Sequence, residues 1–265
     1  LLVFLTVIFG FYLKTSLSTP INFGDEGFHT RMAQWIAENK EYPVWIPFSG
    51  TKLLQLAFAR PPVFNILEAG FSAVLGFHEI IIKTLTPFVA VLTGLAVFLL
   101  TKRLYNKTTG IIATIILVGL PSFVTYSIVF YSDMLFAFFA SLFALTFLVA
   151  VKEGNKKYWL LSSLFAGLAF LTKSSAVVFL VFMPVVFIYL LLFDKTKTKI
   201  TLFRELFIFG VVFLVIVSPF ILRNMYYYQT PLCGANVPIF EGQCHIKNFD
   251  DKYQFETRTT QGGSE

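Results

Sequence analysis

The chain has 265 residues, of which 56% are hydrophobic and only 14% are charged, and its mean hydropathy is +0.74. Soluble domains carry about 25% charged residues, so this composition indicates an integral membrane protein. The formal net charge of +6 does not indicate nucleic-acid binding, because the basic residues fall in short runs between apolar stretches.

The apolar stretches predict an all-α fold with about seven transmembrane helices, because a bilayer core needs about 20 apolar residues per helix. In chain order they cover residues 1–13, 84–100, 110–130, 134–151, 158–172, 174–193 and 206–222. The short stretch 158–172 is flanked by Lys157 and Lys173, whose flexible side chains reach the interface. The chain begins within an apolar run without a Met or a signal-peptide pattern and ends in a polar stretch, so we expect parts to be missing at both ends.

Basic residues between the predicted helices set the orientation. They lie in three loops: Lys102, Arg103 and Lys107; Lys152, Lys156 and Lys157; Lys195, Lys197 and Lys199. If the loop 18–79 is outside, strict alternation puts all three basic loops in the cytoplasm, as the positive-inside rule requires. The sequon Asn106-Lys107-Thr108 is then cytoplasmic and a chance match. We expect a prokaryotic plasma-membrane protein whose active site is extracytoplasmic.

The outer loop is predicted to hold two juxtamembrane amphipathic helices. The first begins near Glu26 and has the apolar stripe Phe28, Met32, Trp35 and Ile36. The second follows Pro61-Pro62, keeps Glu68 in water, and has the apolar face Phe64, Leu67, Phe71, Val74 and Leu75. The alternative, that 62–77 is an eighth span, is rejected because it would place the basic loops outside.

Six ionisable residues share the predicted outer face: Asp25, Glu26, Arg60, Asp133, Lys173 and Arg223. Each has a simpler structural explanation: acidic groups favour helix N-termini, and basic groups anchor to lipid headgroups. Charged groups are scarce in this chain, however, so their common location indicates a functional site. A carboxylate base for an acceptor hydroxyl, with cations on a departing phosphate, fits sugar transfer from a polyprenyl-phosphate donor. No P-loop or other Gly-rich nucleotide motif is present.

The order of several short motifs resembles the GT-C membrane glycosyltransferases. The motifs are Gly24-Asp25-Glu26-Gly27-Phe28-His29, Arg60-Pro61-Pro62, Tyr131-Ser132-Asp133-Met134-Leu135, Gly167 to Lys173, and Ser218 to Asn224 with Phe220 where the family usually has Trp. Within that group, the chain is most similar to the dolichyl-phosphate-mannose protein mannosyltransferases and the bacterial lipid A aminoarabinose transferases. The resemblance implies a polyprenyl-phosphate sugar as donor and a protein, lipid or glycan as acceptor, with membrane lipids around the protein.

The resemblance also implies roles for individual residues. Asp25 is the expected catalytic base, and Glu26 is its helper or a ligand of the acceptor. The donor phosphate is expected to meet cations at three positions, Arg60, Lys173 and Arg223. Asp133 and His29 are expected to contact the acceptor or a metal. Some members have a metal-binding Glu directly before the first cation, but this chain has Ala59, so a divalent ion is possible rather than implied.

Residues 1–222 are predicted to form the catalytic membrane module, and 223–265 to begin an extracytoplasmic polar segment. That segment holds Cys233 and Cys244, for which a disulfide and two free thiols are both open, and a zinc site with His245 lacks a fourth ligand. Two other functions are considered: a polytopic transporter, and a non-catalytic membrane scaffold. A transporter needs polar groups along a path through the membrane, whereas transfer needs them at one face only.

Overall fold

A computed structural model describes residues 1–21, 24–44, 46, 58–193 and 198–231. Within these residues the chain is helical, with no strand. The helices are α1 (Leu2–Ser18), α2 (Asp25–Asn39), α3 (Val63–Leu75), α4 (Glu79–Leu104), α5 (Lys107–Gly119), α6 (Pro121–Ile128), α7 (Ser132–Glu153), α8 (Lys156–Phe170), the 3-10 turn η1 (Ser174–Val177), α9 (Val178–Phe193) and α10 (Lys199–Tyr228). Cys233, Cys244 and His245 lie outside the described residues.

The protein is an all-α integral membrane protein, as its composition predicts. Among the described helices, α4, α7 and α10 are long and apolar enough to cross a membrane, and the bent pair α5–α6 makes a fourth span if counted as one. Shorter apolar helices are α1, α3 and residues 182–193 of α9. Helix α8 has only 15 residues, as the short stretch 158–172 predicts. All seven predicted stretches fall on helices.

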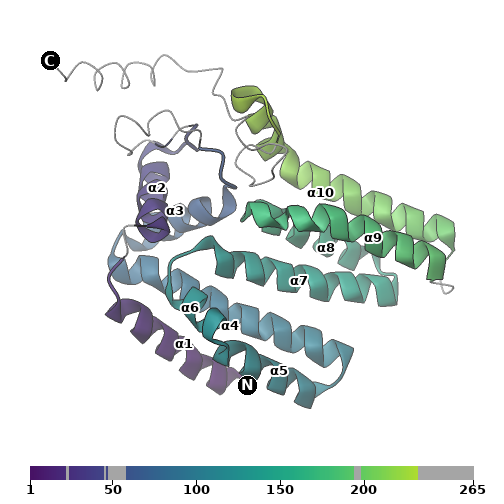
Figure 1. Cartoon of the computed structure of the whole chain (residues 1–265), viewed down its shortest axis with the longest axis horizontal. Coiled ribbons are helices and arrows are strands. Elements are labelled where there is room, and N and C mark those ends of the chain that lie inside the picture. Colours follow the sequence, from purple (N-terminus) through teal and green to yellow (C-terminus); the bar gives the residue numbers. More distant parts are fainter. Residues whose placement is uncertain (22–23, 45, 47–57, 194–197, 232–265) are drawn as a thin grey trace.

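The long helices run between two ends of the molecule. In Figure 1, α2 and α3 lie at the left, beside the starts of α4 and α7, while the α4–α5 and α7–α8 connections lie at the right. An ion pair between Arg103 and Glu153 joins the right-hand ends of α4 and α7. With 26 residues, α4 spans about 39 Å. The basic residues of these two connections are therefore a membrane thickness away from α2.

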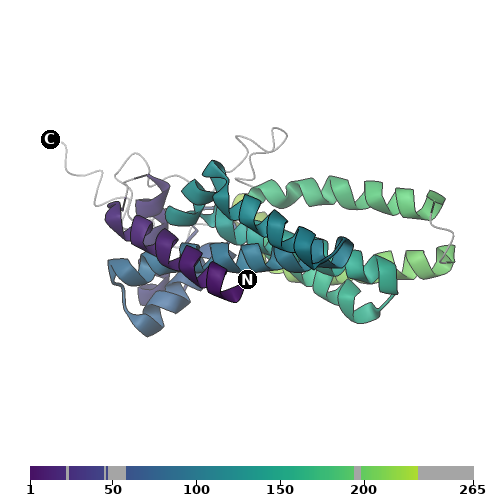
Figure 2. The ribbon, with the colours of Figure 1, turned by 90° about the horizontal axis from the view of Figure 1, so that it is seen from below.

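The predicted span 110–130 is broken rather than straight. Helices α5 and α6 meet at an angle of 66° around Leu120, because Pro121 begins a new helix there. A break in a membrane helix frees carbonyl groups that must find donors. Helix α1 supplies one at the break, where the hydroxyl of Tyr12 donates to Val118 O at 2.6 Å. It supplies another at the end of α6, where the hydroxyl of Ser16 donates to Ile128 O at 2.7 Å. Figure 2 shows α1 lying alongside these helices.

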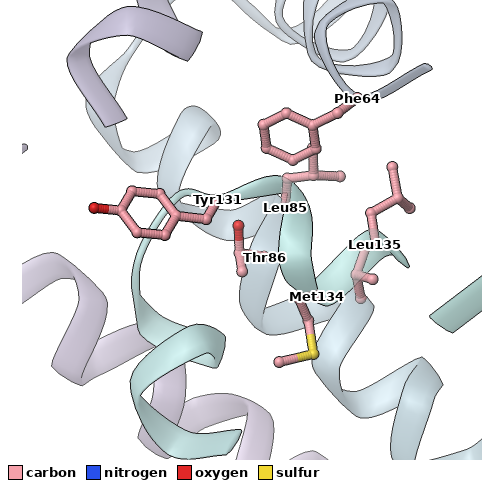
Figure 3. A pocket seen from close by; sticks show the side chains of 7 residues that line it. Phe64, Leu85, Thr86, Tyr131, Met134 and Leu135 are labelled. Atoms are coloured by element: carbon pink, nitrogen blue, oxygen red, sulfur yellow. The ribbon is translucent and has the colours of Figure 1, made fainter. Parts of the chain in front are cut away.

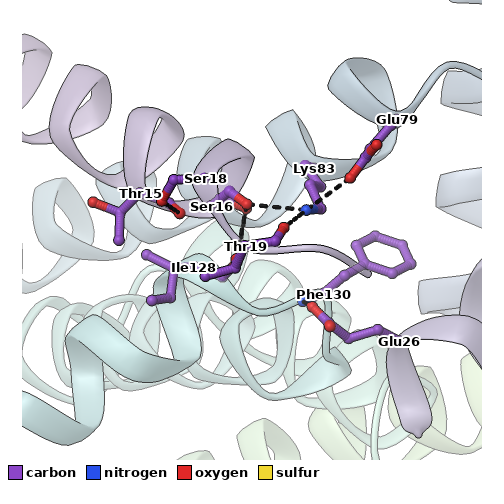
Figure 4. A network of polar contacts seen from close by, with 9 residues as sticks. All are labelled: Thr15, Ser16, Ser18, Thr19, Glu26, Glu79, Lys83, Ile128 and Phe130. Atoms are coloured by element: carbon purple, nitrogen blue, oxygen red, sulfur yellow. Dashed lines mark hydrogen bonds and ion pairs between the residues drawn. The ribbon is translucent and has the colours of Figure 1, made fainter. Parts of the chain in front are cut away.

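Glu79 and Lys83, one turn apart in α4, form an ion pair with 2.9 Å between their charged atoms. Lys83 is buried, and its ammonium also donates to Ser16 O at 3.0 Å and to Thr19 O, as Figure 4 shows. Because these carbonyls close the C-terminus of α1, the cation stabilises the negative end of that helix dipole. The contact fixes α1 against α4 at the end of the bundle where α2 begins.

The prediction that Glu68 of α3 stays in water is wrong. Leu67, Val74 and Leu75 are exposed, whereas Asn65, Glu68 and Ser72 are buried, so Glu68 is not kept in water. In lipid an apolar face need not turn inward, and polar side chains instead face the protein, where partners exist. The carboxylate of Glu68 accepts from the hydroxyl of Ser72 at 2.8 Å, and burial raises its pKa to about 7.

By contrast, α2 buries the face that its sequence predicts. Met32 and Ile36 are buried, with Phe28 and Trp35 packed beside them, while Arg31 and Glu38 are exposed. The two short helices therefore pack on one another, α2 through apolar groups and α3 through its small and polar groups.

Helices α8 and α10 approach closely at Gly167, and this contact can be tested. A Cβ at Gly167 would lie 2.6 Å from Cγ2 of Ile216, so Gly167→Ala should destabilise the protein by about 1–3 kcal/mol. Gly210→Ala in α10 is the matched control, because no atom lies within 4 Å of its added Cβ. Thermal unfolding in detergent micelles should show a lower midpoint for the Gly167 variant alone. Equal midpoints for the two variants would contradict this packing.

Candidate functional site

Three distant segments of the chain are joined at the end of the bundle where α2 and α3 lie. The buried carboxylate of Glu26, in the first turn of α2, accepts a hydrogen bond from Phe130 N at 2.7 Å. At the start of α3, Val63 N donates to Leu171 O at 2.8 Å, just after α8. The second bond uses backbone groups that helices leave unpaired at their ends, and Phe130 N in the first lies in the connection between α6 and α7. They bring the motifs around Asp25, Arg60, Asp133 and Lys173 to one place.

Two ion pairs form between these segments. The guanidinium of Arg60 lies 3.4 Å from a carboxylate oxygen of Asp25, and the ammonium of Lys173 contacts the carboxylate of Asp133. The side chains are partly exposed, 44% for Arg60 and 57% for Asp25. Exposed pairs contribute only about 0–1 kcal/mol to stability, so a ligand can replace either partner at little cost. Arg60 also stacks on the ring of Phe28 at 4.3 Å.

His29 lies one turn after Asp25 in α2. Its Nδ1 is 2.7 Å from Oδ1 of Asn65 in α3, and the ring packs on Phe64 and Phe130. Burial lowers the pKa of His29 to about 4, despite the opposing effect of the hydrogen bond to Asn65. The imidazole is therefore neutral at physiological pH. Because Oδ1 only accepts, Nδ1 carries the proton.

The electrostatic neighbours of His29 show that the pairs share one site. The charges of Arg60, Asp25 and Asp133 all act on its imidazole. At least one charged residue of each ion pair, Arg60 and Asp25 of the first and Asp133 of the second, thus acts on the same ring.

Arg223, at the end of α10, contacts backbone and aromatic groups. Its guanidinium donates to Pro43 O, to Phe58 O at 3.3 Å and to the hydroxyl of Tyr228 at 3.3 Å, and it lies over the ring of Tyr42 at 5.0 Å. These contacts tie α10 to the segments that follow α2 and precede α3. Its contact with a donor phosphate stays a prediction.

The polar contacts within α3 leave a pattern in the sequence. Asn65, Glu68 and Ser72 recur at helical spacing along an otherwise apolar helix, and in lipid such a stripe marks the protein-facing side. The bond from Phe130 N to Glu26 had no sequence signal, because a first-turn carboxylate is equally explained by the helix dipole.

A metal site is not supported by the described residues. No three His, Cys, Asp or Glu side chains among them lie close enough together to hold an ion. Asp133 is paired with Lys173, and His29 directs its Nδ1 to Asn65. The residues expected to bind an acceptor or metal, Asp133 and His29, therefore do not fit a metal here.

The fold and the site define a membrane protein with acidic and basic groups collected at one end of a helical bundle. A family model for dolichyl-phosphate-mannose-protein mannosyltransferase matches residues 59–222, well over half of the chain. The chain belongs to this family. The match includes Arg60, Asp133 and Lys173, whereas Asp25, Glu26, His29 and Arg223 lie outside it. No curated protein and no solved structure matches the chain.

Membership shows a mannosyltransferase-type glycosyltransferase in general terms. It implies a lipid-linked sugar as donor and a glycan or protein as acceptor. Together with the apolar spanning helices, it supports an integral membrane location.

Burial of neutral His29 predicts a pH dependence of stability. Its pKa is about 4 in the native protein and 6.5 in the unfolded chain, so between these values protons bind preferentially to the unfolded chain. The contribution of His29 is complete above pH 6.5 and falls by up to about 3 kcal/mol as the pH drops to 4. In His29→Asn, which keeps an N–H near Nδ1 but cannot titrate, this loss should be absent.

The measurement is the unfolding midpoint of both proteins in detergent from pH 8 to pH 4. Glu68 acts in the opposite sense, since its raised pKa gives stability below pH 4.5 that is lost as the pH rises through 7. It is present in both proteins, so the difference between them isolates His29. A difference that does not change with pH would show that the imidazole is not buried in neutral form.

Proposed function

We propose that the protein is a GT-C type glycosyltransferase that moves a sugar from a polyprenyl-phosphate donor to a hydroxyl of a protein, lipid or glycan. The observation that carries the proposal is the convergence of two carboxylates and two cations at one end of the bundle, in a chain of this family. A carboxylate can accept the proton of the acceptor hydroxyl, and cations can stabilise the negative charge of the leaving phosphate.

The proposed reaction is a direct displacement at the anomeric carbon. The acceptor oxygen forms a bond to that carbon while the bond from the carbon to the phosphate oxygen breaks, which inverts its configuration. The acceptor proton passes to Asp25. The polyprenyl phosphate leaves with its negative charge held by Arg60 and Lys173, a charge-assisted contact for which a guanidinium is well shaped.

The ion pairs suggest how the donor enters. In the free protein Arg60 is engaged by Asp25 and Lys173 by Asp133. An arriving phosphate takes over both cations, and the exchange releases Asp25 to accept a proton. Donor binding therefore precedes activation of the acceptor. Glu26 is buried on Phe130 N, so we assign it to holding Asp25 in place.

We propose that this site is extracytoplasmic and that the membrane is the plasma membrane of a prokaryote. Support comes from the basic residues Lys102, Arg103 and Lys152 at the opposite end of α4 and α7, where the positive-inside rule expects the cytoplasm. On this view residues 1–222 form the catalytic module, with the loop 18–79 carrying the acidic motif, and 223–265 begin an extracytoplasmic segment.

The transporter alternative has less support. In the described spanning helices, charged residues lie within about two turns of a helix end, as with Lys83 in α4 and Glu205 in α10. A transport path needs such groups near the middle of the membrane.

Replacement of the proposed base should abolish transfer without loss of the fold. Asp25→Asn removes proton acceptance, and we expect turnover to fall by about 10²–10⁴-fold with normal expression and an unchanged unfolding midpoint. The control is Glu38→Gln, a carboxylate on the exposed side of the same helix that bonds Gln34 at 2.8 Å. The assay follows release of polyprenyl phosphate from a panel of polyprenyl-phosphate sugars. Full turnover in Asp25→Asn would exclude Asp25 as the base.

Orientation can be tested with single cysteines in a background where Cys233 and Cys244 are replaced by Ser. Glu38→Cys should react with a membrane-impermeant maleimide in intact cells, and Lys102→Cys should react only after the membrane is opened. The reverse pattern would place the site in the cytoplasm.

A further inference from the structure

Tyr131 occupies a fixed position in the site that the reaction above does not use. It ends the connection between α6 and α7 and precedes the first residue of α7 in extended conformation. On one side Phe130 N is bonded to Glu26, and on the other Asp133 is paired with Lys173. Tyr131 N also donates to Val129 O at 3.0 Å. The backbone that carries the phenol is therefore held from α2 and from the end of α8.

The ring of Tyr131 packs against apolar side chains, and its hydroxyl points away from them (Figure 3). With Phe64, Thr86 and Met134 it lines a small apolar pocket, and Figure 3 shows its hydroxyl directed away from these side chains. Burial raises the pKa of the phenol, and the charges of Asp25 and Glu26, then Tyr126 and Asp133, raise it further. The hydroxyl therefore stays protonated and can donate a hydrogen bond throughout the physiological range.

That hydroxyl has no hydrogen-bond partner among the residues that the structure describes. Half-buried tyrosines generally direct the hydroxyl to a partner or to water. An aromatic residue of the interfacial belt is the simpler explanation. It does not account for the charges of three carboxylates, Asp25, Glu26 and Asp133, that act on this phenol. Carboxylates only accept hydrogen bonds, whereas the phenol can donate one.

We propose that Tyr131 contacts the sugar ring of the donor and contributes to the choice of sugar. The inference rests on the proposed function. There the phosphate lies on Arg60 and Lys173 and the acceptor hydroxyl on Asp25, so the transferred sugar lies between these groups. Tyr131 follows Phe130, which is bonded to Glu26, and precedes Asp133, which is paired with Lys173, so it is carried by the same part of the site. Sugar hydroxyls both donate and accept, so carboxylates and one phenol complement them. The aromatic face packs against the C–H groups of the ring.

The test compares binding of two ligands by the intact protein in detergent. One is a polyprenyl-phosphate hexose, taken as the tightest binder from a panel of mannose, glucose and galactose forms, and the other is the same polyprenyl phosphate without sugar. Tyr131→Phe removes only the hydroxyl and Tyr131→Ala removes the ring as well. Tyr226→Phe, an exposed tyrosine of α10, is the control. Arg60→Gln serves as the reference for loss of a phosphate contact.

We expect Tyr131→Phe to bind the sugar-bearing donor about three- to tenfold more weakly, and Tyr131→Ala more weakly still. Both variants should bind the sugar-free phosphate as the unaltered protein does, which also shows that they are folded. Arg60→Gln should weaken the binding of both ligands. The sugar contact is overturned if the Tyr131 variants bind both ligands more weakly to the same extent. It is also overturned if they bind both ligands as the unaltered protein does. Failure of the unaltered protein to bind either ligand would instead overturn the proposed function.

Discussion

The hydrogen bond from Phe130 N to the buried carboxylate of Glu26 is the contact on which the site depends. A buried carboxylate is costly unless it is bonded, and a backbone N–H next to a helix start lacks a partner, so each group satisfies the other. The bond holds α2 against the start of α7. Asp25 is adjacent to one partner and Asp133 lies three residues beyond the other, so their separation is set by this contact rather than by their own ion pairs.

Because lipid rather than water surrounds the helices, several features of their packing differ from those of a soluble protein. Helix α3 turns Asn65 and Glu68 inward and leaves Leu67 exposed, because apolar groups gain nothing by leaving lipid while polar groups need the protein. The break at Pro121 survives because the hydroxyl of Tyr12 satisfies a carbonyl that water cannot reach. Charged groups are few for the same reason, and most of those near α2 are paired with one another.

Much of the fold could be predicted from the sequence, since apolar length and the distribution of Lys and Arg give the helices and their alternation. The common end of the bundle for Asp25, Arg60, Asp133 and Lys173 follows from that alternation. Their pairing does not, because it depends on loop contacts such as Val63 N to Leu171 O that leave no pattern in the sequence. The burial of Glu68 was not predicted, because a carboxylate on a helix at the membrane surface was expected to face water.

The central claim is that the charged groups from α2, α3, α7 and the end of α8 form a single phosphate-binding site at one end of the bundle. The most direct test is an electron cryomicroscopy map of the purified protein with a polyprenyl phosphate bound. The account predicts phosphate density in contact with both Arg60 and Lys173, with Asp25 no longer paired to Arg60. Phosphate bound near Lys102 and Arg103, or to Arg60 with Lys173 far from it, would contradict the account.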